Sequence, residues 1–420
     1  MRGLVRNRNF GLLWQAQLVS QFGNQAFVIA LTLWTAETTH SATLTGLMLM
    51  AGVLPAVVLG PLTGTFVDRQ RSRLRIIVTC DLLSGVLVVL FALGFLTGPG
   101  EWRPAMLFVV ALLVGVCNAF FDPALNAFAP DLVAREQIEA ANAFRQSSRQ
   151  ITVLASQGLA GILYALVGPA ALFLLDGLSF LFAGATEMLI RTEEIADCGL
   201  RIADCGTPKG APRGFLGDVA DGFRYVAAQP GMTGFLIAAS VFNALLMPIA
   251  ILLPVFATVY LQADARWYGF LLAAISAGAI AGCALVGATR ATLTGSSRRA
   301  LLVTAFAALA LSLAVLGQVR SRWIALAIAG ATGMLAGMIN VLVLSIIQRR
   351  TSGAYRGRVL ALQAMMTRAL VPIGMVGGGA AADLAGRSVP LVYGICGALA
   401  LSSVMLLATR RTTRAFLASA

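Results

Sequence analysis

Long apolar stretches alternate with short charged or Gly/Pro-containing segments along the whole chain. Most of these stretches have about 18 residues or more, enough for a helix to cross the hydrocarbon core of a bilayer. In the first half of the chain they lie at 10–34, 42–66, 76–97, 105–125, 141–166 and 170–190. In the second half they lie at 233–259, 268–288, 300–317, 323–347, 359–384 and 388–408. The pattern predicts an all-α membrane protein with twelve transmembrane helices.

The longest polar interruption, 191–231, separates six predicted helices from six. We therefore expect an N-terminal six-helix half at 1–190, a cytoplasmic linker at 191–231 and a C-terminal six-helix half at 232–420. Two halves of equal hydropathy are typical of transporters built from repeats. In the linker the pentapeptide IADCG occurs twice, and we interpret it as a local duplication, because the ligand spacing of known metal sites is missing.

Composition supports a membrane protein and excludes a soluble one. Only 12% of the 420 residues are charged and 58% are hydrophobic, whereas a soluble domain carries about 25% charged residues. The net charge of +13 would suggest nucleic-acid binding in a soluble protein. Here the basic residues lie in short loops between apolar stretches, so we expect the lipid bilayer as a partner and no nucleic acid.

The distribution of basic residues predicts the orientation. If the N-terminus is cytoplasmic, the segments on the cytoplasmic side hold 23 Lys and Arg residues and those on the opposite side hold five. Positive residues concentrate on the cytoplasmic side of membrane proteins. Both termini are therefore expected in the cytoplasm, in a multi-pass protein of the cell (inner) membrane.

No motif indicates an enzyme. The sequence contains neither the GxxxxGK pattern of P-loop ATPases nor the HExxH pattern of metalloproteases, and His40 is its only histidine. We therefore expect no catalytic residue, no cofactor and no bound metal.

The segment "GPLTGTFVDRQRSRLR" (60–75) ends the second predicted helix with a cluster of charge. Gly60 and Gly64 lie four residues apart, a spacing that lets another helix approach closely. Gly64, Asp68, Arg69 and Arg73 resemble motif A of the major facilitator superfamily. The resemblance implies the major facilitator fold, with these four residues as a gating latch between the halves.

Further segments resemble one branch of that superfamily, the macrolide-efflux and enterobactin-export proteins. They are "RNFGLLWQAQLVSQFGNQAF" at the start, "FFDPALNAFAPDLV" (120–133), "AANAFRQ" (140–146), "LLDGLSFL" (174–181) and "YRGRVLALQ" (355–363). The branch usually has Gly-Asp in its first helix, and this chain has Gly23-Asn24. A neutral amide cannot carry a proton, so the acid of that helix cannot be transferred to this chain.

The resemblance implies a secondary transporter, expected as a monomer, that exports an amphipathic small molecule such as a drug, siderophore or natural product. Alternating access, with 1–190 rocking against 232–420, and proton antiport would drive the export. One alternative is a facilitator of lysophospholipids or other lipids. Another is a sensor or assembly partner that transports nothing.

Uncharged polar residues and one arginine are candidates for substrate binding. Gln17, Gln21 and Asn24 recur on one helical face, which must turn away from lipid. Asn243 and Asn340 are candidates for the opposite wall of a cavity. Arg368 completes the candidates. It is expected near mid-membrane, where a guanidinium needs a partner such as an anionic substrate.

Acidic residues inside predicted helices are candidates for proton coupling, because such residues are costly in a membrane. Asp122, which precedes Pro123, is the first choice and Asp176 the second. For Asp81 we favour a structural role, in an ion-pair network with Arg145. Two other acids are expected at the edges of the membrane: Glu187 as a surface charge, and Asp383 as a helix cap or an ion-pair partner of Arg387.

Overall fold

The computed structural model describes residues 7–70, 72–98, 100–134, 137–191, 223–224, 226–229, 231–289, 295–351 and 356–409. Within these ranges the chain is helical and contains no strand, which confirms the predicted all-α class there. The duplicated IADCG segment lies outside them. The chain divides into two compact units, one formed by Met1–Trp34 and Ala51–Pro212 and the other by Thr35–Met50 and Arg213–Ala420.

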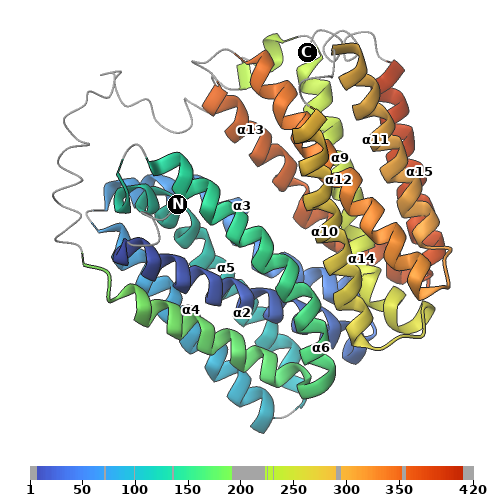
Figure 1. Cartoon of the computed structure of the whole chain (residues 1–420). Coiled ribbons are helices and arrows are strands. Elements are labelled where there is room, and N and C mark those ends of the chain that lie inside the picture. The colour runs from blue at the N-terminus through green and yellow to red at the C-terminus, as the bar shows by residue number, and fades with distance from the viewer. Residues whose placement is uncertain are drawn as a thin grey trace. The chain divides into compact units, whose positions relative to one another are not determined.

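Five long helices supply the first unit, and they correspond to the six apolar stretches of the first half (Figure 1). They are α2 (Arg8–Thr39), the later part of α3 (Ala42–Arg69), α4 (Arg73–Thr97), α5 (Arg103–Phe128) and α6 (Ile138–Glu187). Short 3-10 turns flank α5 at Gly100–Trp102 (η1) and Ala129–Leu132 (η2).

Two predicted spans, 141–166 and 170–190, both lie in the element α6, which is divided into two helical pieces between them. Gly168 has a φ of 77°, in the left-handed region, and Pro169 follows it. Proline lacks the N–H that would continue the helical ladder, and glycine adopts this backbone conformation without a side-chain clash. The break therefore lies where the sequence places its Gly-Pro pair.

The second unit contains the helices of the C-terminal half (Figure 1). They are α9 (Met232–Val255) with a π-helical turn η4 (Phe256–Tyr260), α10 (Ala265–Thr289), α11 (Gly295–Leu316), α12 (Arg322–Arg350), α13 (Arg356–Ala369), α14 (Val371–Leu384) and α15 (Val389–Thr409). The predicted span 359–384 is divided between α13 and α14 at Leu370. Pro372 stands at the start of α14, where a missing N–H costs no helical bond.

Nine helical segments of the described residues are long and apolar enough to cross a membrane, and one of them, Ala140–Glu187, covers two predicted spans. The stretch 10–34 is not among the nine, and its helix α2 is rich in Gln and Asn. The stretch 359–384 is also not among them, because α13 and α14 have only 14 residues each. The structure thus supports a multi-pass membrane protein, while the number of twelve crossings and the side of each terminus stay predictions.

Small residues let helices of each unit approach closely. In the first unit Gly85 of α4 lies against Leu181 of α6, and Gly177 of α6 lies against Val89 of α4. In the second unit a Cβ added to Gly333 or Gly337 of α12 would collide with backbone carbonyls of α10. Such glycines permit backbone-to-backbone packing, which drives helix association in lipid.

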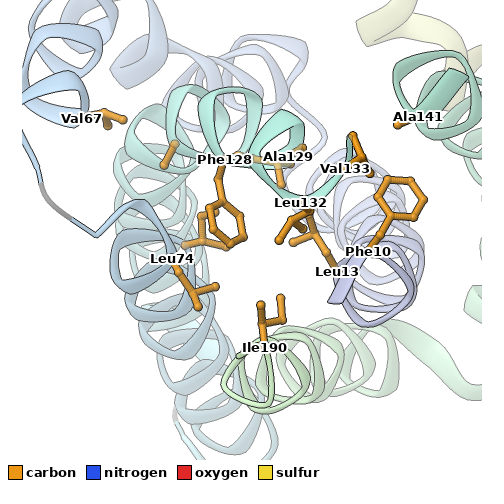
Figure 2. Packing of buried hydrophobic residues seen from close by; sticks show 13 residues of the cluster. Phe10, Leu13, Val67, Leu74, Phe128, Ala129, Leu132, Val133, Ala141 and Ile190 are labelled. Carbon is orange, nitrogen blue, oxygen red and sulfur yellow. The ribbon is translucent and has the colours of Figure 1, made fainter. Parts of the chain in front are cut away.

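A cluster of buried hydrophobic side chains packs together within the first unit (Figure 2). It brings together side chains from α2, α3, α4, α5 and the residues after α6, among them Phe10, Leu13, Leu74, Phe128 and Ile190. Asn7 donates to the backbone oxygen of Leu132 at 2.7 Å beside it. The cluster joins the start of the chain to the end of the sixth predicted span, so it fixes α2 against α6.

Candidate functional site

A cluster of buried polar side chains lies inside the first unit, between α2, α4 and α6. Its members are at most 8% exposed: Gln17 and Ser20 of α2, Asp81 and Ser84 of α4, and Asp176, Ser179 and Glu187 of α6. Ionisable residues within membrane helices are costly and commonly functional. This cluster is therefore the candidate functional site.

Glu187 belongs to this cluster, and the expectation that it is a surface charge is wrong. Its side chain is 0% exposed. The amide of Gln17 donates to its Oε1 atom at 3.3 Å. Glu187 points inward because this amide and the Asp81 carboxyl offer it polar contacts in an otherwise apolar interior.

Asp81 and Glu187 form a carboxyl pair. The two carboxyl groups interact with each other inside the cluster. Asp81 Oδ2 and Glu187 Oε2 accept no hydrogen bond from the described residues. Two carboxylates cannot bond to each other, so the pair needs at least one proton.

The expected ion pair between Asp81 and Arg145 is wrong. No ion pair of the described residues includes Asp81. Arg145 interacts electrostatically with Arg149 and Asp122 instead. Asp81 turns away from them because the helix packing directs its side chain toward α6, where it meets Glu187.

Asp176 is completely buried, and neither of its carboxyl oxygens has a hydrogen-bond partner in the described part of the chain. A Cβ added to Gly23 of α2 would lie 2.9 Å from Asp176 Oδ1. The glycine before Asn24 thus makes room for the carboxyl group. Asp176 is also close enough to Asp81 for an electrostatic interaction.

Asp122, the first-choice acid, lies on an exposed face of α5 beside Pro123. It interacts with Arg145, as described above. The structure therefore does not bring Asp122 into the cluster with Asp176. Its role in proton coupling stays a prediction.

The predicted substrate-binding residues fall in different surroundings. Gln17 is engaged with Glu187, and Gln21 and Asn24 are half-buried, with Oε1 of Gln21 lacking a partner in the described structure. Asn243 donates to the carbonyl of Ala239 in its own helix at 2.9 Å. Asn340 is exposed. The side chain of Arg368, the remaining candidate, lies outside the described structure.

In the motif A segment, Arg73 has a defined role in the structure. Its Nη1 atom donates to Asp131 Oδ2 at 2.9 Å and to the carbonyl of Ala127 at 3.2 Å. These bonds fasten the start of α4 to the end of α5. Sequence reasoning missed this role of Asp131, which lies eight residues after Pro123.

The other motif A residues are Gly64, Asp68 and Arg69. Arg69 is exposed, and the side chain of Asp68 lies outside the described part of the structure. No described atom lies within 4 Å of a Cβ built at Gly60 or Gly64. The close helix approach expected at these two glycines is therefore not seen.

A second polar contact lies in the second unit, at the start of α3. Asp383 accepts hydrogen bonds from the backbone N–H groups of Ala42 and Thr43, at 2.8 and 2.9 Å. The hydroxyls of Ser41 and Thr43 donate to it at 2.8 and 2.7 Å. Asp383 is therefore a helix cap, one of its two expected roles, and it caps a helix far from it in sequence.

The chemistry available to the buried cluster is proton binding. Among the described residues no group of three or more His, Cys, Asp and Glu side chains could hold a metal ion. Three carboxyl groups with unpartnered oxygens and one amide donor can take up and release protons. The sequence indicates that two of these carboxyl groups face the same way. Asp176 and Glu187 lie about three helical turns apart and so share one face of α6.

Comparison with known proteins relates this architecture to transporters. Residues 4–418 match the family model described as transmembrane secretion effector. Macrolide efflux protein A of Streptococcus pyogenes is 25% identical over 372 residues, which cover 87% of each chain. The multidrug efflux pump Tap of Mycolicibacterium fortuitum is 26% identical over 385 residues, 89% of each chain.

Solved structures share the fold. A bacterial homologue of the iron transporter ferroportin, in its inward-facing state, has a TM-score of 0.68 at 17% identity, covering 97% of this chain and all of that one. The nucleoside transporter NupG has a TM-score of 0.67 at 13% identity, covering 98% of this chain and 99% of that one. The chain is a transporter and not an enzyme, and it belongs to the transmembrane secretion effector family, in the macrolide-efflux branch of the major facilitator superfamily.

Proposed function

We propose that this protein exports an amphipathic small molecule from the cytoplasm across the cell (inner) membrane. Its family membership and its relatives named as efflux pumps support this proposal. Export proceeds by alternating access, with 1–190 rocking against 232–420. Macrolides are the first substrate class to test, because relatives matching most of the chain are named for them.

Proton antiport is the energy source in this proposal. The observation that carries it is the group of buried carboxyls on α4 and α6, which have no basic partner among the described residues. A neutral residue, Asn24, stands in α2 where related proteins usually carry an acid. The carboxyls of α4 and α6 offer a replacement, with Asp176 supported by its complete burial and Asp122 as the alternative.

Substrate contacts in this proposal come from Gln21, Asn24, Asn243 and Asn340, with Arg368 as a partner for anionic groups. Gln17 is a weaker candidate, since its amide is engaged with Glu187. Gln21 and Asn24 are half-buried on the same helix, and Oε1 of Gln21 has no partner among the described residues.

Accumulation of labelled erythromycin in inside-out proteoliposomes tests the proposal. Purified protein should concentrate the macrolide when the lumen is acidic, and a protonophore should abolish the accumulation. Empty liposomes and liposomes with the protein but no pH gradient are the controls. Equilibration of a fluorescent lysophospholipid without a gradient, in the absence of macrolide uptake, would favour the lipid facilitator instead. A protein that moves neither compound would favour the sensor.

A further inference from the structure

We propose that Asp81 and Glu187 act as one proton-sharing site, which Gln17 links to α2. The inference rests on the proposed proton antiport and assigns it to residues on three helices. Asp81 lies on α4 and Glu187 at the end of α6, and the two side chains are 3% and 0% exposed. Neither is the acid that a reading of the sequence would select first.

The hydrogen bonds define where the proton lies. Gln17 Nε2 donates to Glu187 Oε1 at 3.3 Å, whereas Asp81 Oδ2 has no partner among the described residues. Because Gln17 directs a donor at Glu187, Glu187 is the member of the pair that carries the negative charge. The pair therefore holds one proton in this arrangement and can take up a second one on Glu187.

No basic side chain of the described structure neutralises the pair. The titratable groups that face it are Cys80 on α4, Cys117 on α5 and Asp176 on α6. All three are neutral or negative, so they oppose a second charge at the site. Like charges in a buried site cannot both ionise easily, and their protons belong to the pair rather than to either residue.

Asp176 supplies an independent reason to place proton chemistry here. It is 0% exposed, neither oxygen has a donor among the described residues, and it lies near Asp81. An ionised carboxylate without any partner is strongly unfavourable in such surroundings. Asp176 is therefore neutral in this arrangement, and Glu187 is the charged carboxyl of the cluster.

Gln17 is the positioning residue that transmits this change. It belongs to α2, and Gln21 and Asn24 follow it by about one and two turns on the same face. Protonation of Glu187 weakens the hydrogen bond from Gln17, because a charged acceptor binds a donor more strongly than a neutral one. Loading of a proton on α6 thus loosens the helix that carries two candidate substrate contacts.

Infrared titration of the purified protein in lipid nanodiscs tests the site without any substrate. Wild-type protein should show a carboxylic-acid C=O band that appears as the pH falls. Glu187→Gln should remove this band, and Asp81→Asn should shift it, since the two groups titrate as a pair. Gln17→Leu should make the band persist to higher pH, because Glu187 loses a donor to its charged form.

Two variants serve as controls, and a third guards against misfolding. Glu101→Gln changes an exposed carboxyl outside the cluster, and Asp122→Asn removes the rival acid; both should leave the band unchanged. Asp81→Glu keeps a carboxyl and should retain a shifted band even if Asp81→Asn fails to fold. A band that survives in folded Glu187→Gln, or that disappears in Asp122→Asn, overturns the assignment.

Proton release on addition of erythromycin separates this inference from the proposed function. An indicator dye in weakly buffered solution should report protons released by wild-type protein and none by Glu187→Gln. If the infrared result holds but erythromycin is neither transported nor coupled to protons, the proton site stands and macrolide export fails. If wild-type protein and Glu187→Gln release protons equally, the proton-sharing site is rejected while export stands.

Discussion

Single carboxyl groups carry much of this molecule's chemistry, and Asp383 illustrates their structural use. Its carboxylate accepts four hydrogen bonds from Ser41, Ala42 and Thr43, all between 2.7 and 2.9 Å. It satisfies backbone N–H groups that have no partner within α3. The contact ties the start of α3 to the end of α14 within the second unit.

Asp383→Ala should therefore destabilise the protein by about 1–2 kcal/mol, the usual cost of losing an N-terminal cap. The measurement is thermal or denaturant unfolding in detergent, followed by tryptophan fluorescence. Glu101→Ala is the control, since Glu101 is an exposed carboxyl in the short turn η1. Equal losses for the two variants would show that the cap contributes nothing specific.

The sequence predicted acids inside the membrane but not their partners. Asp176 was identified from its position in an apolar stretch, and the structure adds its complete burial. Glu187 looked like a surface residue because it is four residues from a charged loop. Its inward direction depends on how α2 and α4 pack against α6, and hydropathy along one helix does not contain that information.

Helices follow the hydropathy pattern closely, and the deviations occur at glycine and proline. Gly168 and Pro169 divide α6 into two helical pieces, and α13 and α14 separate at Leu370 before Pro372. The sequence marks both places, but it does not say whether the chain bends or stops. That outcome depends on the neighbouring helices, which determine whether a freed backbone group finds another partner.

The seam between α10 and α12 yields a prediction at the scale of elements. Gly337 of α12 packs directly on the backbone of α10, so that an added Cβ would collide with the carbonyl of Ala279. Gly337→Ala should cost about 1–3 kcal/mol, because two backbones must separate to admit a methyl group. The unfolding temperature of the purified variant is the measurement.

The control for this seam lies in the other helix. A Cβ at Gly287 of α10 meets nothing within 4 Å in the described structure, so Gly287→Ala should be neutral or slightly stabilising. A stable Gly337→Ala variant would mean that α10 and α12 adjust easily, and that the seam does not fix their distance.

At the scale of the whole molecule, export requires the two halves to move, and the motif A residues are the proposed latch. Asp68→Asn should leave the protein inserted and folded but strongly reduce transport, because it removes a charge from the contact that the motif makes in related transporters. Erythromycin uptake by proteoliposomes is compared with that of Glu101→Gln at equal protein content. Full activity of Asp68→Asn would reject the latch.

The structure also adds a detail to the division of the molecule. Thr35–Met50 belongs to the second compact unit, although it joins two helices of the N-terminal half. Asp383 and the close packing of Gly379 against Ala42 hold this segment there. Rocking of 1–190 against 232–420 would have to break these contacts or bend the chain near Trp34 and Ala51. The sequence could not reveal this, because the contact joins residues more than 300 positions apart.

Coupling between macrolide and proton is the central claim, and proton flux driven by a macrolide gradient tests it most directly. Proteoliposomes loaded with erythromycin, with equal pH on both sides, are diluted into drug-free buffer while an internal dye records pH. Wild-type protein should acidify the lumen as the drug leaves. Glu187→Gln should exchange labelled erythromycin without any change of pH. Drug efflux by wild-type protein without proton entry, or proton entry that is undiminished in Glu187→Gln, would contradict this account.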